Sequence, residues 1–129
     1  MKWQEFEEKV REVCEAHDFT TKFRFVFSDG EGKAEIDVVA ERYGLTLCID
    51  AKLYSASRYR TSQLRKEAEK HRRRCERFAR LTGRNAIPVI VSFIDDSIYF
   101  HEGCIIVPFE SLNHFLAEIH YYLSEFGYL

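Results

Sequence analysis

The chain has 129 residues, of which 46% are hydrophobic and 31% are charged. This length and composition predict a single domain, residues 1–129, that buries one core. No apolar run reaches the ~18 residues of a membrane span, and the acidic start lacks the pattern of a signal peptide. We therefore expect no membrane partner and a cytoplasmic location.

The net charge of −2 conceals a strong asymmetry. Residues 58–84 contain eleven lysines and arginines against three glutamates, whereas the rest of the chain is acidic. A basic block on an acidic domain predicts a local interaction with an anionic partner. The four cysteines are widely spaced within apolar patterns, which predicts buried thiols rather than a zinc site or a disulfide framework.

The first predicted element is a helix over residues 1–18. Apolar residues recur at helical spacing and are expected to face the core: Trp3, Phe6, Val10, Val13 and Cys14. A strand is predicted over residues 20–27, where three alternating phenylalanines define one buried face: Phe23, Phe25 and Phe27. Two glycines within residues 28–32 indicate a loop after this strand.

Two further strands, joined by a tight turn at residues 42–44, are predicted within residues 34–52. Alternation places four residues of each strand on one apolar face: Ala34, Ile36, Val38 and Ala40, then Leu45, Leu47, Ile49 and Ala51. Asp50 and Lys52 share the opposite face of the second strand, about 6–7 Å apart at ~3.3 Å per residue. Asp37 on the first strand converges with them if the two strands pair.

Charges inside strands this apolar need an explanation, because burying an unpaired charge costs several kcal/mol. Two carboxylates beside one ammonium form a small, oxygen-rich site of the kind that holds Mg²⁺. A buried Asp–Lys ion pair, with the second aspartate at a strand edge, would explain the same pattern. The spacing alone leaves both interpretations open.

The order of Asp37, a turn and Ile49-Asp50-Ala51-Lys52 resembles the PD-(D/E)xK nuclease core. The surrounding pattern is similar to archaeal Holliday-junction resolvases and to Mrr- and RecB-type nucleases. Two departures are Ile36, where the motif has proline, and Asp50 in place of glutamate. The resemblance implies an α/β restriction-endonuclease-like fold, with a mixed central β-sheet flanked by helices.

The resemblance also implies roles for individual residues. Asp37, Asp50 and the Ala51 carbonyl would hold Mg²⁺ or Mn²⁺, and a glutamate of the first helix would reach the metal directly or through water. Glu7 best matches that position, and Glu8 is the alternative. Lys52 would orient or deprotonate the attacking water, or stabilise the charge of the phosphorane; these roles stay open.

A long helix is predicted over residues 61–82, after a polar stretch at 53–60. Its buried face is expected to contain Leu64, Ala68, His71, Cys75, Phe78 and Ala79, with His71 as a core or boundary residue. Arginine suits bidentate phosphate contacts, so the other faces predict a surface for nucleic acid. The residues expected to bind it are Arg58, Arg60, Arg65, Lys66, Arg72 and Arg73. An acidic partner subunit or a plain surface helix would also explain the pattern.

The remaining chain predicts a central strand at 86–93, short strands at 98–100 and 104–107, and one last helix after Pro108. This helix carries an aromatic tail that would serve either a homodimer interface or core packing: Tyr121, Tyr122, Phe126 and Tyr128.

The sequence thus predicts a metal-dependent DNA endonuclease of the repair, recombination or restriction type. Nothing in it resembles a module that reads bases, which favours structure-specific or weakly sequence-specific cleavage. Two alternatives are a non-catalytic nucleic-acid-binding or assembly subunit that retains the fold, and an RNA-processing nuclease.

Overall fold

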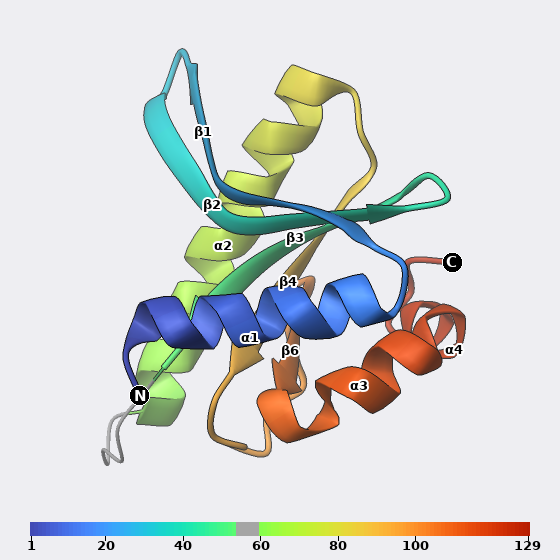
Figure 1. Cartoon of the computed structure of the whole chain (residues 1–129). Helices are drawn as coiled ribbons and strands as arrows, with labels where there is room; N and C mark the ends of the chain where they lie inside the picture. Colours follow the sequence, from blue (N-terminus) through green and yellow to red (C-terminus); the bar gives the residue numbers. More distant parts are fainter. Residues whose placement is uncertain (54–59) are drawn as a thin grey trace.

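The computed structural model describes residues 1–53 and 60–129, where a six-stranded sheet lies between two layers of helices (Figure 1). The helices are α1 (Trp3–Ala16), α2 (Arg60–Thr82), α3 (Phe109–Ala117) and α4 (Ile119–Glu125). The strands are β1 (Thr20–Asp29), β2 (Gly32–Arg42), β3 (Leu45–Lys52), β4 (Ala86–Ser92), β5 (Phe100–His101) and β6 (Cys104–Pro108).

The sheet is mixed, with the strand order β1-β2-β3-β4-β6-β5. β2 is antiparallel to both β1 and β3, whereas β3, β4 and β6 run parallel to one another. Antiparallel neighbours can follow a tight turn, but parallel neighbours need a crossover, and α2 provides it between β3 and β4. The predicted α/β class, with a mixed central sheet flanked by helices, is confirmed at this level.

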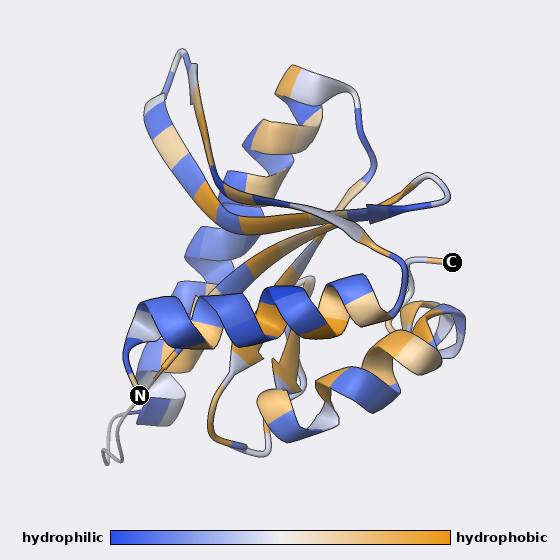
Figure 2. Ribbon diagram, viewed as in Figure 1, coloured by the Kyte–Doolittle hydropathy of each residue, from blue (hydrophilic) through white to orange (hydrophobic). Residues whose placement is uncertain are grey.

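The two faces of the sheet have separate cores. α1, α3 and α4 cover one face, where Phe6, Val10 and Leu112 pack against the strands. α2 covers the other face, where Phe78 and Leu64 are fully buried. Figure 2 shows hydrophobic residues concentrated in the central strands and hydrophilic residues over much of α2.

β3 and α2 have the faces that the sequence predicts. Leu47 and Ile49 lie in the core on the α1 side of the sheet, and Cys48 lies in the core on the α2 side. α2 buries Leu64, Ala68, His71, Cys75 and Phe78, whereas Ala79 is only half-buried. The alternation of β3 therefore brings Asp50 and Lys52 to the α2 side of the sheet, as expected.

The β1–β2 hairpin departs from simple alternation near its centre. Phe23 and Val38 are paired across the two strands and pack in the core on the α1 side. Phe25 and Ile36, the pair two positions further on, pack in the core on the α2 side instead. Regular alternation would keep residues two apart on one face, so the predicted single apolar face of each of these strands is wrong.

The break lies at Arg24 of β1, opposite Asp37 of β2. Arg24 has φ 46°, a left-handed conformation that residues other than glycine seldom adopt. The ladder pairs residue 23 with 38 and residue 25 with 36, without a pair between them. The hairpin therefore changes face at this point, and its outer half extends along α2 (Figure 1).

Ion pairs attach the tip of this hairpin to α2. The Arg77 guanidinium donates to both carboxylate oxygens of Asp29, at 2.9 and 2.7 Å, and to the Gly32 carbonyl at 2.6 Å. The hydrogen bonds from Arg77 lower the pKa of Asp29 to about 2. Arg80 adds an ion pair to Glu31 at 3.2 Å. Part of the positive charge of α2 is thus neutralised within the molecule.

The single last helix of the prediction is two helices, α3 and α4, separated at Glu118, whose φ of −113° and ψ of 33° are not helical. Most of the aromatic tail packs within the molecule. Phe126 stacks on Phe100 with 5.0 Å between ring centroids, and the Tyr128 hydroxyl donates to the Gly103 carbonyl. Tyr121 is 60% exposed, and the homodimer stays a prediction.

The predicted core face of α1 is confirmed at three residues and wrong at one. Phe6, Val10 and Cys14 are buried as expected, but Trp3 is 51% exposed because it lies under the Arg24 guanidinium rather than in the core. All four cysteines are buried free thiols, as predicted. Among the described helices, none has the length and apolar composition needed to cross a bilayer.

Candidate functional site

The predicted acidic residues meet where β2 and β3 part. The last β2–β3 pair on this side is Val38 with Ile49, whereas β3 continues to pair with β4 as far as Lys52. Beyond the last pair, the Ala51 N–H donates to Asp37 Oδ2 at 3.0 Å. The Asp37 carboxylate thus accepts in place of a backbone carbonyl of β2. The separation of the strands leaves Asp37 and Asp50 beside each other.

The pKa values of Asp37 and Asp50 shift in opposite directions. Burial, together with the hydrogen bond and the negative charge of Asp50, raises the pKa of Asp37 to about 8. Burial also acts to raise the pKa of Asp50, but the His71 ring, the Asp37 hydrogen bond and the Lys52 ammonium outweigh it and lower that pKa. Asp37 is therefore the protonated partner, because two adjacent buried carboxylates resist simultaneous ionisation.

Lys52 lies between two carboxylates. Its Nζ is 3.0 Å from Asp50 Oδ2 and 3.3 Å from Glu67 Oε2 of α2. The sequence interpretation treated Glu67 only as one of three acids among many arginines. The sequence did contain a signal that Glu67 faces the sheet. Glu67 follows the buried Leu64 by three residues and precedes the buried Ala68, and residues three or four apart share a helix face. Glu67 links α2 to the end of β3.

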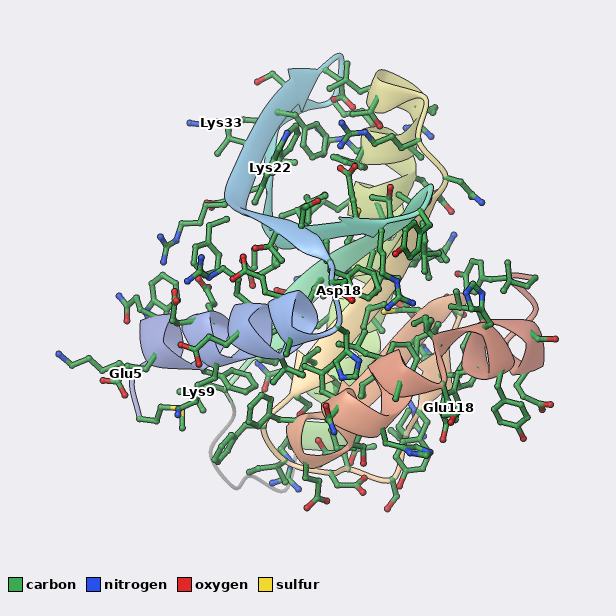
Figure 3. All side chains as sticks on the ribbon, turned by 45° about the vertical axis from the view of Figure 1, so that its right-hand side comes forward. Glu5, Lys9, Asp18, Lys22, Lys33 and Glu118 are labelled. Carbon is green, nitrogen blue, oxygen red and sulfur yellow. The ribbon has the colours of Figure 1, made fainter. Side chains whose placement is uncertain are left out.

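Glu7 approaches this pair from α1. It is 3% exposed, and burial raises its pKa, partly offset by Arg24, whose guanidinium lies 3.2 Å from the Glu7 carboxylate. The negative charge of Asp50 raises the same pKa further. Glu8, the alternative, instead pairs with Arg11 on the outer side of α1. Glu5 and Lys9 of α1 extend into solvent (Figure 3), whereas Glu7 is the charged residue of this helix that is buried.

His71 lies beneath the site as a core residue, as expected. It is fully buried, and its Nε2 donates to the Cys48 carbonyl at 2.7 Å. Burial lowers the pKa of the ring, although the nearby Asp50 acts in the opposite direction. The hydrogen bond of His71 to the Cys48 carbonyl supports the backbone of β3 next to Asp50.

A cleft of about 660 Å³ opens above the acidic residues. Its floor is formed by Asp37, Asp50 and Lys52. The hairpin contributes the wall made of Glu31, Lys33, Ala34 and Glu35. α2 contributes the opposite wall, which is entirely basic: Lys70, Arg73, Arg74 and Arg77. The cleft thus has a basic side, a mainly acidic side and an acidic floor.

Of the predicted nucleic-acid-binding residues that the structure describes, one lines this cleft, namely Arg73. Arg65 and Lys66 are exposed on α2 outside its lining, and Arg58 lies outside the described residues. Arg60 pairs with Asp96, and Arg72 pairs with Glu76 at 2.7 Å. The Arg72 pair is an i,i+4 contact within α2, whereas the Arg60 pair depends on the tertiary fold, which helical spacing does not reveal.

Three other basic residues of α2, which the prediction did not single out as binding residues, line the cleft: Lys70, Arg74 and Arg77. Arg77 is engaged by the hairpin, and Lys70 lies 3.8 Å from Glu67. Within the described part of the chain, Arg73 and Arg74 have no carboxylate within 4.0 Å. They are therefore the cations of this wall that are best placed to meet an external anion.

The donor set on the floor suits a hard divalent cation. Asp37 and Asp50 supply carboxylate oxygens, and Ala51 offers a backbone carbonyl; such oxygens are the ligands that Mg²⁺ and Mn²⁺ take. Burial is the main reason for the raised pKa of Asp37, and the hydrogen bond and negative charge of Asp50 add to it. The residues present thus fit such an ion on chemical grounds.

A second group of ligand-type residues lies elsewhere. Among the described residues, the one set of three His, Cys, Asp or Glu side chains with ligand atoms all within 4.8 Å is Glu69, His101 and Glu102. Glu69 and His101 are hydrogen-bonded at 3.1 Å. Glu7, Asp37 and Asp50 do not meet this distance as a trio.

No protein-family model matches the sequence. An uncharacterised protein from Archaeoglobus fulgidus is 75% identical over 129 residues, which cover the whole of both chains. The crystal structure of a protein of unknown function, AF1548, is similar with a TM-score of 0.60 and 18% identity, over 95% of this chain and 78% of that one. This likeness concerns the fold alone. Protein VC1899 from Vibrio cholerae has a TM-score of 0.45 at 13% identity, over 96% of this chain and 33% of its own.

Proposed function

We propose that this chain, which belongs to the same family as the Archaeoglobus fulgidus protein, is a divalent-cation-dependent nuclease that hydrolyses phosphodiester bonds in DNA. One observation carries the proposal: Asp37, Asp50 and Lys52 form the floor of a cleft whose α2 wall is basic. An acidic floor suits a cation, and a basic wall suits a polyanion, so the cleft combines the two requirements of metal-assisted phosphate hydrolysis.

The order of elements supports the finer fold assignment, which is the restriction-endonuclease-like arrangement. A helix precedes three antiparallel strands, and a crossover helix then leads to a parallel strand. Asp37 lies in the middle of β2, beside the Asp50-Ala51-Lys52 segment that ends the adjacent β3, and the motif resemblance requires these residues to lie together. Glu7 approaches from the first helix, in the position that the same resemblance assigns to it.

Each residue of the floor has a distinct part in the proposed reaction. Asp37, Asp50 and the Ala51 carbonyl would hold the cation, with Glu7 reaching it directly or through water. A bound Mg²⁺ or Mn²⁺ supplies Lewis-acid polarisation of the phosphate and a water of lowered pKa. Lys52, fixed by Asp50 and Glu67, presents its ammonium to the attacking water or to the charge that develops on the phosphorus oxygens.

The α2 wall would hold the phosphates that flank the scissile bond. Lys70 and Arg74 are one helical turn apart, about 6 Å along the axis at 1.5 Å per residue, and Arg73 lies next to them. Such contacts position a nucleic acid without reading its bases. The opposite wall contains Glu31 and Glu35, which repel phosphates. The cleft therefore suits one strand at a time, in agreement with structure-specific or weakly specific cleavage.

The test is a cleavage assay with end-labelled single-stranded, duplex and branched DNA, and with RNA of the same sequence, in Mg²⁺, Mn²⁺ or EDTA. Asp50→Asn removes one charge from the floor at nearly constant shape. Asp18→Asn is the matched control, because Asp18 is exposed outside the cleft and has φ 67°, which asparagine tolerates.

We expect the wild type and the Asp18→Asn variant to cleave DNA only with a divalent cation, and the Asp50→Asn variant to lose at least ~100-fold in rate. Equal binding of DNA by all three proteins without cleavage would overturn the proposal and leave a nucleic-acid-binding subunit. Cleavage confined to RNA would replace DNA by RNA as the substrate.

A further inference from the structure

Arg24 combines an unfavourable backbone with a position beside the site. Its φ of 46° is the left-handed conformation, in which an arginine is strained. It is opposite Asp37, at the point where the β1–β2 hairpin changes face. Strain of this kind persists where the surrounding structure enforces it, and such residues concentrate at functional sites.

The side chain of Arg24 has one buried and one exposed side. Its guanidinium lies 3.2 Å from the carboxylate of Glu7, whose side chain is 4% exposed, yet the Arg24 side chain itself is 46% exposed. Two rings support the guanidinium: Trp3, with its centroid 5.4 Å away, and Phe23, with its centroid 5.7 Å away. Arg24 is therefore held by cation–π contacts that do not depend on Glu7.

The Glu7 carboxylate cannot attract both the Arg24 guanidinium and a divalent cation at the aspartates with full strength. With no metal bound, the guanidinium of Arg24 neutralises the buried Glu7 carboxylate. A divalent cation at Asp37 and Asp50 would draw on the charge of Glu7 and weaken its attraction for Arg24. The rings of Trp3 and Phe23 would keep the guanidinium in place, half-exposed and available to another anion. Arg24 is not part of the cleft lining, so this anion would lie on the α1 side of the site, away from α2.

We propose that Arg24 is a substrate-binding residue that exchanges Glu7 for a phosphate of the nucleic acid when a divalent cation occupies the site. This inference rests on the proposed nuclease function and adds a phosphate contact that depends on the cation. It also explains why an arginine, rather than asparagine or glycine, occupies a left-handed position: the guanidinium is needed there in spite of the backbone strain.

The first test measures the affinity for fluorescein-labelled single-stranded DNA by anisotropy, in Ca²⁺ and in EDTA, over a range of salt concentrations. Arg24→Asn removes the guanidinium and suits the backbone. Lys22→Asn is the matched control, because Lys22 is an exposed cation of the same strand that extends into solvent (Figure 3). Glu7→Gln releases Arg24 without any cation.

We expect Arg24→Asn to weaken binding about tenfold in Ca²⁺ and less than twofold in EDTA. The slope of log K against log salt in Ca²⁺ should become shallower by about one unit, as for the loss of one phosphate contact. Glu7→Gln should bind more tightly than the wild type in EDTA and respond less to Ca²⁺. Lys22→Asn should behave like the wild type in its response to Ca²⁺.

The second test uses Trp3, the only tryptophan of the chain, as a reporter of the contact. Addition of Ca²⁺ without DNA should change the fluorescence of Trp3 in the wild type, because Arg24 lies over its ring, and should leave the Arg24→Asn variant unchanged. Thermal unfolding of Arg24→Asn at or above the wild-type midpoint shows that the variant is folded.

Equal affinities of Arg24→Asn and the wild type in Ca²⁺ would overturn the inference, as would an equal loss in Ca²⁺ and EDTA. If the Arg24→Asn variant does not fold, the Glu7→Gln variant is the test. The inference is then overturned if Glu7→Gln binds DNA in EDTA no more tightly than the wild type does. A failure of the nuclease proposal looks different. In that case the wild type would not cleave DNA, whereas the effect of Ca²⁺ on binding through Arg24 would persist and support the exchange.

Discussion

Replacement of Asp37 by asparagine should stabilise the protein and flatten the dependence of its stability on pH. The pKa of Asp37 is raised from 3.8 to about 8 in the folded state. Between these values the unfolded chain loses the proton that the folded protein retains, so the free energy of unfolding falls as the pH rises, by up to ~1.4 kcal/mol per pH unit for one group. Water reaches the half-buried carboxyl, so we expect about 2–3 kcal/mol over the whole window.

Asparagine retains the useful contacts at this position. Its carbonyl oxygen can accept the Ala51 N–H, and its amide can donate to Asp50 in place of the proton of Asp37. The difference in stability between Asp37→Asn and the wild type should therefore be small near pH 4 and grow to its full value above pH 8. Mg²⁺ should stabilise the wild type at pH 8.5 and have little effect on the variant.

Urea unfolding at pH 4, 6 and 8.5, with and without Mg²⁺, measures these quantities, and the asparagine-for-aspartate change at Asp18 is the control for the loss of one charge. A difference in stability between Asp37→Asn and wild type that does not change with pH would refute the reasoning, because it would mean that Asp37 ionises normally in the folded protein.

Three further predictions follow from the site and the core. Lys52→Met should destabilise the protein by about 2–3 kcal/mol in urea unfolding, because it leaves the buried carboxylate partner unpaired, whereas Lys9→Met on the exposed face of α1 should change the stability by less than ~0.5 kcal/mol. The double replacement of Arg73 and Arg74 by glutamine should make the salt dependence of DNA binding shallower by about two units of slope, as measured by anisotropy titrations. Phe78→Ala should cost about 3–5 kcal/mol in urea unfolding, because Phe78 is fully buried beneath the hairpin; a cost below ~1 kcal/mol would contradict this packing.

Periodicity predicted the parts of the fold in which local pattern and packing agree. The alternation of β3 and the apolar stripe of α2 are both present, and together they place Asp50 and Lys52 facing α2. Asp37 joins them because β2 and β3 pair as the turn between them predicts. The acidic floor of the cleft was therefore accessible from the sequence.

The change of face in the hairpin and the residues of the basic wall could not be predicted from the sequence in this way. The change of face at Arg24 depends on a left-handed residue that has no local signal, since arginine is not a residue type expected there. The arginines of α2 are divided between internal ion pairs and the cleft by the position of the hairpin tip. Helical spacing identifies a basic helix, but only the tertiary structure shows which of its cations face the acidic floor.

The most direct test of the central claim is a titration with Mn²⁺, which counts bound ions by isothermal calorimetry in the wild type, Asp50→Asn and Glu69→Gln. A cation site between β2 and β3 predicts that Asp50→Asn weakens Mn²⁺ binding at least ~10-fold, whereas Glu69→Gln, which alters the separate group with His101 and Glu102, leaves that binding step unchanged. Loss of Mn²⁺ binding in Glu69→Gln, with full binding in Asp50→Asn, would contradict the account.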